Sequence, residues 1–167
     1  MTTEQQDGDA KLPARSLIVR RHVTEAGVAT AVRELPDSTR TAAEAASALE
    51  CEVGAIASSL VFLADGEPLL VMTSGRHRVD TDMLAKAAGA EAVSMAPAKQ
   101  VRAVTGQAIG GVAPVGHPAP LRTLVDEALR AYGTVWAAAG TPHTVMPLTF
   151  DDLVTLTRGQ VCRVAAD

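Results

Sequence analysis

The chain has 167 residues, of which 47% are hydrophobic and 2% aromatic, and its formal net charge at pH 7 is -4. This length suits one domain with an aliphatic core. The acidic balance argues against broad, non-specific binding to DNA or RNA, although it is compatible with a local basic patch. Two cysteines, Cys51 and Cys162, fit a reduced cytosolic protein better than a disulfide scaffold.

The N-terminal part of the chain is expected to be a tail followed by the first elements of a single domain. Residues 1–14 are polar and show no periodicity, so we expect a mobile tail before a domain over residues 15–167. No secretory signal is visible, because basic residues follow the short apolar stretch 17–19, and we expect a cytoplasmic protein with no membrane contact. In chain order the pattern predicts a helix over 16–25 capped by Ser16, a strand over 29–35, and a helix over 41–49 that opens with the capping box Thr41-Glu44.

A β-hairpin is the clearest strand signal in the sequence. Two apolar runs, Ile56 to Ala64 and Pro68 to Ser74, flank the turn sequence Asp65-Gly66. Because side chains alternate along a strand, Ser58 points the same way as Leu60 and Phe62. If that face is turned inward, the Ser58 hydroxyl is buried or faces a pocket.

The rest of the chain mixes helices and strands. The pattern predicts a helix to about Ala88 capped by Asp80 or Thr81, strands over 92–94, 122–126, 134–138, 144–147 and 160–164, a helix from Pro97 to about Thr105, a helical turn near Tyr132, and a helix from the capping box Thr149-Asp152 to Gly159. These elements do not alternate strictly as β-α-β. We therefore expect a single α/β domain with a mixed, curved, barrel-like sheet flanked by helices.

The stretch Thr105 to Pro120, TGQAIGGVAPVGHPAP, which we call the glycine loop, is the most unusual part of the sequence. Glycines permit close approach of a ligand to the backbone, and prolines fix φ. The loop is also apolar, unlike a solvated linker. It matches neither a phosphate-binding loop nor a dinucleotide fingerprint. These features favour a shaped loop over a pocket, and the alternative is a tight structural turn.

Several polar residues are candidates for a site. His117 and His143 lie on glycine- and proline-rich turns, which places them at a pocket rim or on the surface without a role. Asp126 ends an apolar strand, where burying an unpaired carboxylate is costly. It therefore either caps a turn or accepts N–H groups of the glycine loop.

The remaining candidates for a site are a basic cluster and the histidines and cysteines, which are scattered along the chain. Arg76, His77 and Arg78 could meet a phosphate or form a solvated corner. The histidines and cysteines show none of the spacings typical of metal sites, so we expect neither a metal nor a cofactor.

Together these motifs resemble the YbaK/EbsC/ProX family of free-standing aminoacyl-tRNA deacylases, which are similar to the editing insertion domain of bacterial prolyl-tRNA synthetase. The resemblance rests on TAAEAASALECEVGAIASSLVF, GRHRVD, VTGQAIGGVAPVGH, TLVDEAL and VWAAAGTPHTVMPLTFDDLVTLT, and it includes the G-x-x-x-P motif from Gly110 to Pro114. It implies the fold of that editing domain. It also implies hydrolysis of the ester at the 3′ end of a mischarged aminoacyl-tRNA, with an aminoacyl-tRNA synthetase as a further partner.

The resemblance also implies roles for residues. Gly110 and Gly111 would place the ester, Pro114 would stiffen the loop, and Asp126 would support it. The residues so assigned to catalysis are Gly110, Gly111, Ser58 and Asp126; those assigned to the substrate are Val112, Ala113, Pro114, Gly116, His117, Gly140, His143 and Phe62; those assigned to tRNA are Arg76, His77 and Arg78.

One position departs from the family pattern. Many members carry a lysine in a strand motif I-V-K-S-L-V-F, and Ser58 stands at that place here. A neutral hydroxyl cannot supply the charge of an ammonium group. Three alternatives follow: hydrolysis persists with water positioned by Ser58 and the loop, the substrate is different (another small acyl ester included), or the domain is a binding module that recognises aminoacyl-tRNA ends or an aminoacyl-like metabolite without hydrolysing them.

Overall fold

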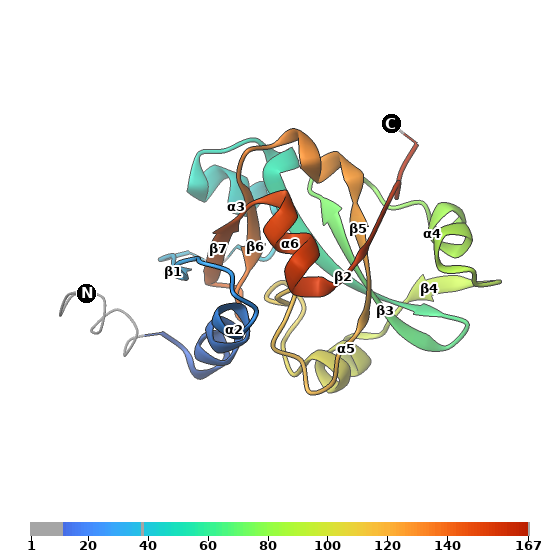
Figure 1. The fold of residues 1–167 in the computed structure, drawn as a ribbon, viewed down its shortest axis with the longest axis horizontal. Helices are drawn as coiled ribbons and strands as arrows, with labels where there is room; N and C mark the ends of the chain where they lie inside the picture. Colours follow the sequence, from blue (N-terminus) through green and yellow to red (C-terminus); the bar gives the residue numbers. More distant parts are fainter. Residues whose placement is uncertain (1–11, 38, 167) are drawn as a thin grey trace.

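The computed structural model describes residues 12–37 and 39–166, so most of the expected tail over residues 1–14 lies outside the described residues. The described chain forms an eight-stranded mixed sheet in the order β1-β7-β6-β2-β3-β5-β8, with β4 paired to β2. Helices flank this sheet on several sides (Figure 1). The predicted α/β domain with a mixed sheet is therefore confirmed.

The elements have the following bounds. The strands are β1 (Arg33–Glu34), β2 (Ile56–Ala64), β3 (Glu67–Ser74), β4 (Val93–Met95), β5 (Arg122–Asp126), β6 (Val135–Ala138), β7 (Thr144–Leu148) and β8 (Gln160–Cys162). The helices are α2 (Ala14–Glu25), α3 (Ala42–Leu49), α4 (Thr81–Ala88), α5 (Ala98–Thr105) and α6 (Phe150–Thr157), with short 3-10 helices η1 (Val53–Ala55) and η2 (Glu127–Ala131).

Local sequence signals predicted most element ends correctly. The hairpin turns at Asp65-Gly66, where both residues have positive φ, and the capping boxes at Thr41 and Thr149 are both formed. The expected strand over 29–35 is wrong in extent, because only β1 pairs with β7. The expected cap at Ser16 is also wrong: α2 begins at Ala14, and the buried Ser16 hydroxyl donates to Thr144 Oγ1 at 3.0 Å.

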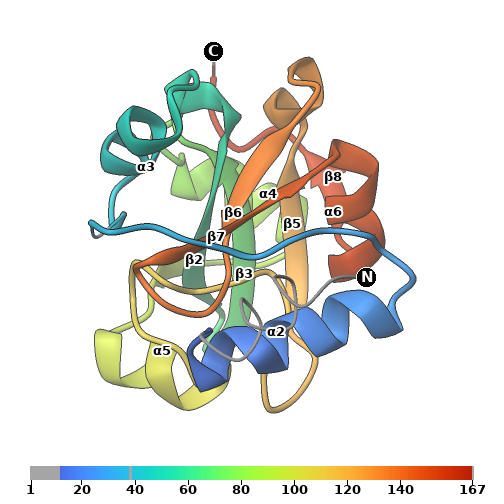
Figure 2. The same cartoon turned by 90° about the vertical axis from the view of Figure 1, so that its left-hand side faces the viewer.

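The strands β2 and β3 are covered on both faces. On one face Val61 and Met72 join a large apolar core that includes Val19 of α2 and Leu153 of α6. On the other face Phe62 packs in a smaller core with residues of β3, α4 and β5. Figure 2 shows α3 and α6 on opposite sides of the strands, with α2 crossing one end. No helix of the described chain is long and apolar enough to cross a bilayer.

The pairing of β2 leaves a gap along one of its edges. One edge is paired with β3 along nearly its whole length. On the other edge, Ile56 and Ala57 pair with the parallel strand β6, while residues 62–64 pair with the antiparallel strand β4. Within the described chain, residues 58–61 therefore have no paired strand on that edge. The gap includes Ser58, and it is where a cavity opens.

Candidate functional site

A cavity of about 290 Å³ lies at the gap in the sheet. Its walls come from residues 39–42 and Ala45, from residues 56–60 of β2, from residues 73–75 and His77, from Ile109, Gly110 and Val112 of the glycine loop, and from residues 136–138 and Val145. The structure thus brings Ser58 and the glycine loop, which are far apart in the sequence, to one hollow. Ser58 also lies opposite Thr73 in the β2–β3 register.

The two central glycines of the loop serve different purposes. Gly110 lines the cavity with φ +90°, a conformation that favours glycine, and a Cβ there would lie 2.9 Å from Cγ of Arg40. Gly111 is buried against the turn after β6, where a Cβ would lie 2.5 Å from the carbonyl carbon of Thr141. Gly110 therefore lines the cavity and lets Arg40 approach the loop, whereas Gly111 allows two backbone segments to touch.

The hydrogen bonds of the loop leave several of its backbone amides without an acceptor among the described residues, those of Gly110 and Val112 included. The N–H of Gly111 donates to the carbonyl oxygen of Ala108 at 2.9 Å, and that of Ala113 donates to Gln107 Oε1 at 2.7 Å. The N–H groups of Gly110 and Val112 donate to no acceptor among residues 12–37 and 39–166. Both residues line the cavity. Amides of this kind can bind the oxygen of a ligand.

Residues behind the loop support it from the side of α2. A Cβ on Gly116 would lie 3.0 Å from Val19 Cγ2, and one on Gly140 would lie 3.1 Å from the carbonyl oxygen of Arg15. The glycines at 116 and 140 thus let α2 approach, and neither lines the cavity. Ala113 and Pro114 are also buried.

His117 supports the loop as well. Its Nε2 atom lies 2.8 Å from the carbonyl oxygen of Ala113. Burial lowers the pKa of the His117 imidazole, the bond to Ala113 opposes this change, and the nearby His22 adds to it. A neutral imidazole that donates its Nε2 proton to Ala113 fits this geometry.

Asp126 holds the corner at residues 75–78, which we call the basic corner. Its Oδ2 atom accepts from the Ser74 N–H at 3.0 Å and from Thr73 Oγ1 at 3.3 Å, and it lies 2.7 Å from His77 Nδ1. Its Oδ1 atom accepts from the Ala128 N–H, so that Asp126 caps η2. Of the two roles expected for Asp126, capping a turn is confirmed. Its remaining bonds among the described residues go to the end of β3 and to His77 of the basic corner, instead of the glycine loop.

A second cavity, of about 500 Å³, lies on the other side of the basic corner. It is lined by Arg76, Arg130 and Arg163, among other residues, and it shares His77 with the first cavity. Arg76 and Arg78 are exposed. His77 is different from its neighbours, since its side chain is only 3% exposed and lies against Asp126.

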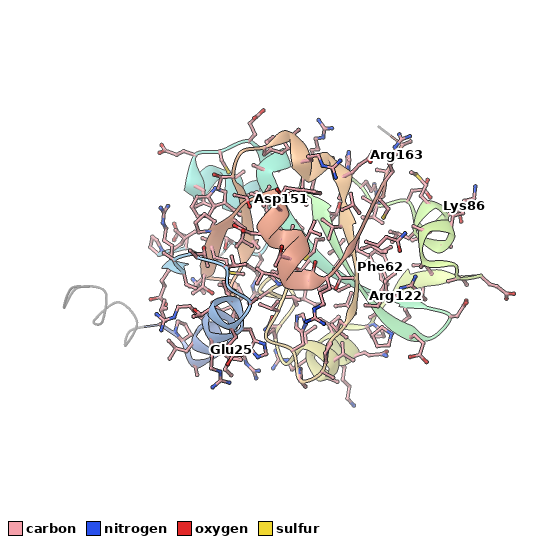
Figure 3. The ribbon with its side chains drawn as sticks, viewed as in Figure 1. Glu25, Phe62, Lys86, Arg122, Asp151 and Arg163 are labelled. Carbon is pink, nitrogen blue, oxygen red and sulfur yellow. The ribbon has the colours of Figure 1, made fainter. Side chains whose placement is uncertain are left out.

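Two residues assigned to the substrate lie elsewhere. Phe62 is 2% exposed and belongs to the smaller apolar core, and Figure 3 shows it on the side of α4 and β4. His143 is exposed, and its carbonyl oxygen accepts from the Leu35 N–H next to β1. Neither lines the first cavity. Conversely, sequence reasoning missed Arg40, Trp136 and Gln107; only Gln107 carried a signal, as a lone amide in an apolar loop.

A family model described as "Aminoacyl-tRNA editing domain" matches residues 36–156 of the chain. The "Putative Cys-tRNA(Pro)/Cys-tRNA(Cys) deacylase EbsC" of Enterococcus faecalis is 29% identical over 120 residues, which cover 71% of this chain and 73% of that protein. The proline–tRNA ligase of Leuconostoc citreum is 34% identical over 101 residues, which cover 60% of this chain but only 17% of the ligase.

A solved structure is also closely similar. The crystal structure of a "putative trans-editing enzyme for prolyl tRNA synthetase" superimposes with a TM-score of 0.88 at 40% sequence identity. The match covers 94% of this chain and all of that one. The structural match therefore extends beyond the residues matched by the family model.

Proposed function

The chain belongs to the aminoacyl-tRNA editing domain family, and from this premise we propose that it acts in trans to hydrolyse the ester that joins a wrong amino acid to tRNA. One observation carries the proposal. The cavity at the gap in the sheet is lined by Ser58, Gly110 and Val112, and the N–H groups of the last two have no acceptor within the described chain. Such a site suits a reaction in which charge develops on a carbonyl oxygen.

The reaction needs few protein groups. A water oxygen attacks the ester carbonyl carbon, and the N–H groups of Gly110 and Val112 stabilise the negative charge that develops on the carbonyl oxygen. The bond from the acyl carbon to the ribose 3′ oxygen then breaks, and that oxygen takes a proton, so that free amino acid and tRNA leave. The adjacent ribose 2′-OH and the Ser58 hydroxyl are the groups that orient the water.

The size of the cavity favours a small aminoacyl group. Ligand pockets commonly measure about 300 to 1,000 Å³, and this one lies at the lower end of that range. A cavity of this size acts as a second sieve, which admits a small side chain and excludes larger ones. The name of the Enterococcus relative makes cysteine on tRNA(Pro) the first substrate to test.

Arg40 offers a positive charge in place of the missing lysine. Among the described residues that line the cavity, Arg40 is the one whose side chain is permanently charged. Its Cβ and Cγ atoms lie next to Gly110. We assign to it the electrostatic part of the lysine's role, toward the ester oxygen or the terminal phosphate.

The partner of the site is the 3′ end of an aminoacyl-tRNA. The exposed residues Arg76 and Arg78 of the basic corner adjoin the cavity and suit the phosphates of the acceptor end. His77 keeps the corner in place through Asp126, and it is less suited to direct contact because it is almost fully buried. The net charge of -4 predicts weak intrinsic affinity for tRNA, which a synthetase partner would raise.

Deacylation of tRNA(Pro) charged with cysteine, alanine or proline tests the proposal. The pure protein should release the small non-cognate amino acids well above the buffer rate and should spare prolyl-tRNA(Pro). Hydrolysis of none of a wider panel of mischarged tRNAs would refute it.

A binding module without hydrolysis is the second candidate, and the serine at position 58 favours it. This alternative predicts that the protein binds a non-hydrolysable aminoacyl-adenosine amide, or slows spontaneous deacylation of the tRNA, with no turnover. The same panel therefore separates the two functions.

A further inference from the structure

The glycine loop is held from within by a buried glutamine. Gln107 is 3% exposed, although its side chain is polar. Its backbone is fixed by Thr105, whose hydroxyl accepts from the Gln107 N–H at 3.0 Å. The same hydroxyl lies 2.7 Å from the carbonyl oxygen of Val101 and 3.0 Å from that of Gln107, and it shares its one proton between them. The side chain thus starts from a rigid position at the end of α5 and reaches across the loop.

The side-chain amide of Gln107 accepts one hydrogen bond and donates another. Its Oε1 atom accepts from the Ala113 N–H at 2.7 Å, and its Nε2 atom donates to the Val115 carbonyl oxygen at 3.4 Å. His117 Nε2 lies 2.8 Å from the carbonyl oxygen of Ala113. Side chains from both ends of the loop therefore engage both polar groups of the Ala113 backbone. We call Gln107, Ala113 and His117 the loop clamp.

The loop clamp lies next to the part of the loop that meets the cavity. The N–H and C=O of one trans peptide point in opposite directions, so fixing the Ala113 N–H also fixes the carbonyl of Val112. At the other side, Gly111 is fixed by its bond to Ala108 and by its contact with Thr141. The short segment from Gly110 to Val112 is thereby held at Gly111 and at the peptide that follows Val112.

We propose that Gln107 is a positioning residue, which aims the N–H groups of Gly110 and Val112 into the cavity by clamping the Ala113 peptide. This inference rests on the proposed function, because it concerns how the same site binds and hydrolyses an aminoacyl ester. A displacement of about 1 Å in such a site lowers a rate by about 100-fold. Gln107 itself does not line the cavity.

The chemistry of the clamp permits a specific rescue. A protonated glutamic acid carries one acceptor and one O–H donor, as the amide of glutamine does, whereas a carboxylate has no donor for the Val115 carbonyl. Burial raises the pKa of a carboxyl group. Gln107→Glu should therefore function at acidic pH and fail as the pH rises, while Gln107→Met should fail at every pH.

The experiment compares wild type, Gln107→Met, Gln107→Glu and the control Gln100→Met, which makes the same chemical change at a half-buried position of α5. Three quantities are measured: kcat and KM on the mischarged tRNA that wild type hydrolyses best, affinity for alanyl and cysteinyl amides of 3′-amino-3′-deoxyadenosine, and hydrogen exchange of the Ala113 amide by NMR. Exchange reports on the clamp independently of activity.

We expect Gln107→Met to lower kcat by about 100-fold with little change in KM, and to speed Ala113 exchange by about tenfold. Gln100→Met should match wild type in all three. The kcat of Gln107→Glu relative to wild type should rise between about pH 8 and pH 5.5. Faster Ala113 exchange with unchanged kcat and analogue affinity would overturn the inference, as would a flat pH ratio for Gln107→Glu.

The outcome also separates this inference from the proposed function. If wild type binds the analogues but hydrolyses no tRNA, the hydrolase proposal fails, and the analogue affinity of Gln107→Met then decides the role of Gln107. A loss of affinity would support the clamp, and unchanged affinity would overturn it. If wild type neither binds nor hydrolyses, both proposals fall.

Discussion

Replacing Gly111 by alanine tests the packing behind the glycine loop. The added Cβ would lie 2.5 Å from the carbonyl carbon and 2.7 Å from Cα of Thr141, and 2.8 Å from the backbone nitrogen of Pro142. Ordinary contacts begin at 3.4 Å, so the two backbones must separate by about 0.9 Å. No flexible side chain can absorb this change. A shift of that size at the loop should lower kcat by about 100-fold and the free energy of unfolding by about 1–3 kcal/mol.

Deacylation kinetics and urea denaturation measure the two effects on one protein preparation. Gly133→Ala is the matched control, because Gly133 is exposed and a Cβ there would meet nothing within 4 Å. The control should keep both the kcat and the denaturation midpoint of wild type. If Gly111→Ala behaved like this control, the assignment of Gly111 to close backbone packing beside the site would be refuted.

Three further predictions concern charge at and near the cavity. Arg40→Gln should lower kcat about tenfold or more, and adding Ser58→Lys should restore much of the loss if the cavity needs one cation. Steady-state kinetics test this, and a double variant no faster than Arg40→Gln would contradict it. Because burial lowers the pKa of His117 below its ordinary value of 6.5, its contribution to stability is present above pH 6.5 and is lost as the pH falls toward the folded-state pKa. Urea unfolding at several pH values should therefore show a shallower loss of stability toward acid pH for His117→Gln, and equal slopes would contradict this. Asp126→Asn should lower the free energy of unfolding by about 3 kcal/mol, because the buried carboxylate accepts hydrogen bonds from several donors and an amide cannot accept all of them. An unchanged denaturation midpoint would contradict this prediction.

The sequence predicted those parts of the fold that depend on local chemistry. Capping boxes at Thr41 and Thr149 and the Asp65-Gly66 turn involve residues a few positions apart, and all three are formed. The predicted helix cap at Ser16 was wrong because the Ser16 hydroxyl donates instead to Thr144, which is far away in the sequence. Local propensity contains no information about such a partner.

Sequence motifs led to some residues of the candidate site, whereas tertiary packing determines the others. Ser58, Gly110 and Val112, which the motifs nominated, line the same cavity. The alternation of side chains placed Phe62 on the same face as Ser58, yet Phe62 packs in the smaller core beside α4 and does not line the cavity. Arg40 was missed because it lies in an irregular segment, where no periodicity indicates direction.

Titration of the isotope-labelled protein with the alanyl amide of 3′-amino-3′-deoxyadenosine tests most directly whether the glycine loop grips an acyl group. NMR would follow the backbone amides of Gly110 and Val112, which have no acceptor in the described chain. Saturable downfield shifts of these two amide protons are the predicted result. Binding that shifts only residues around the second cavity, or no binding at all, would contradict the account.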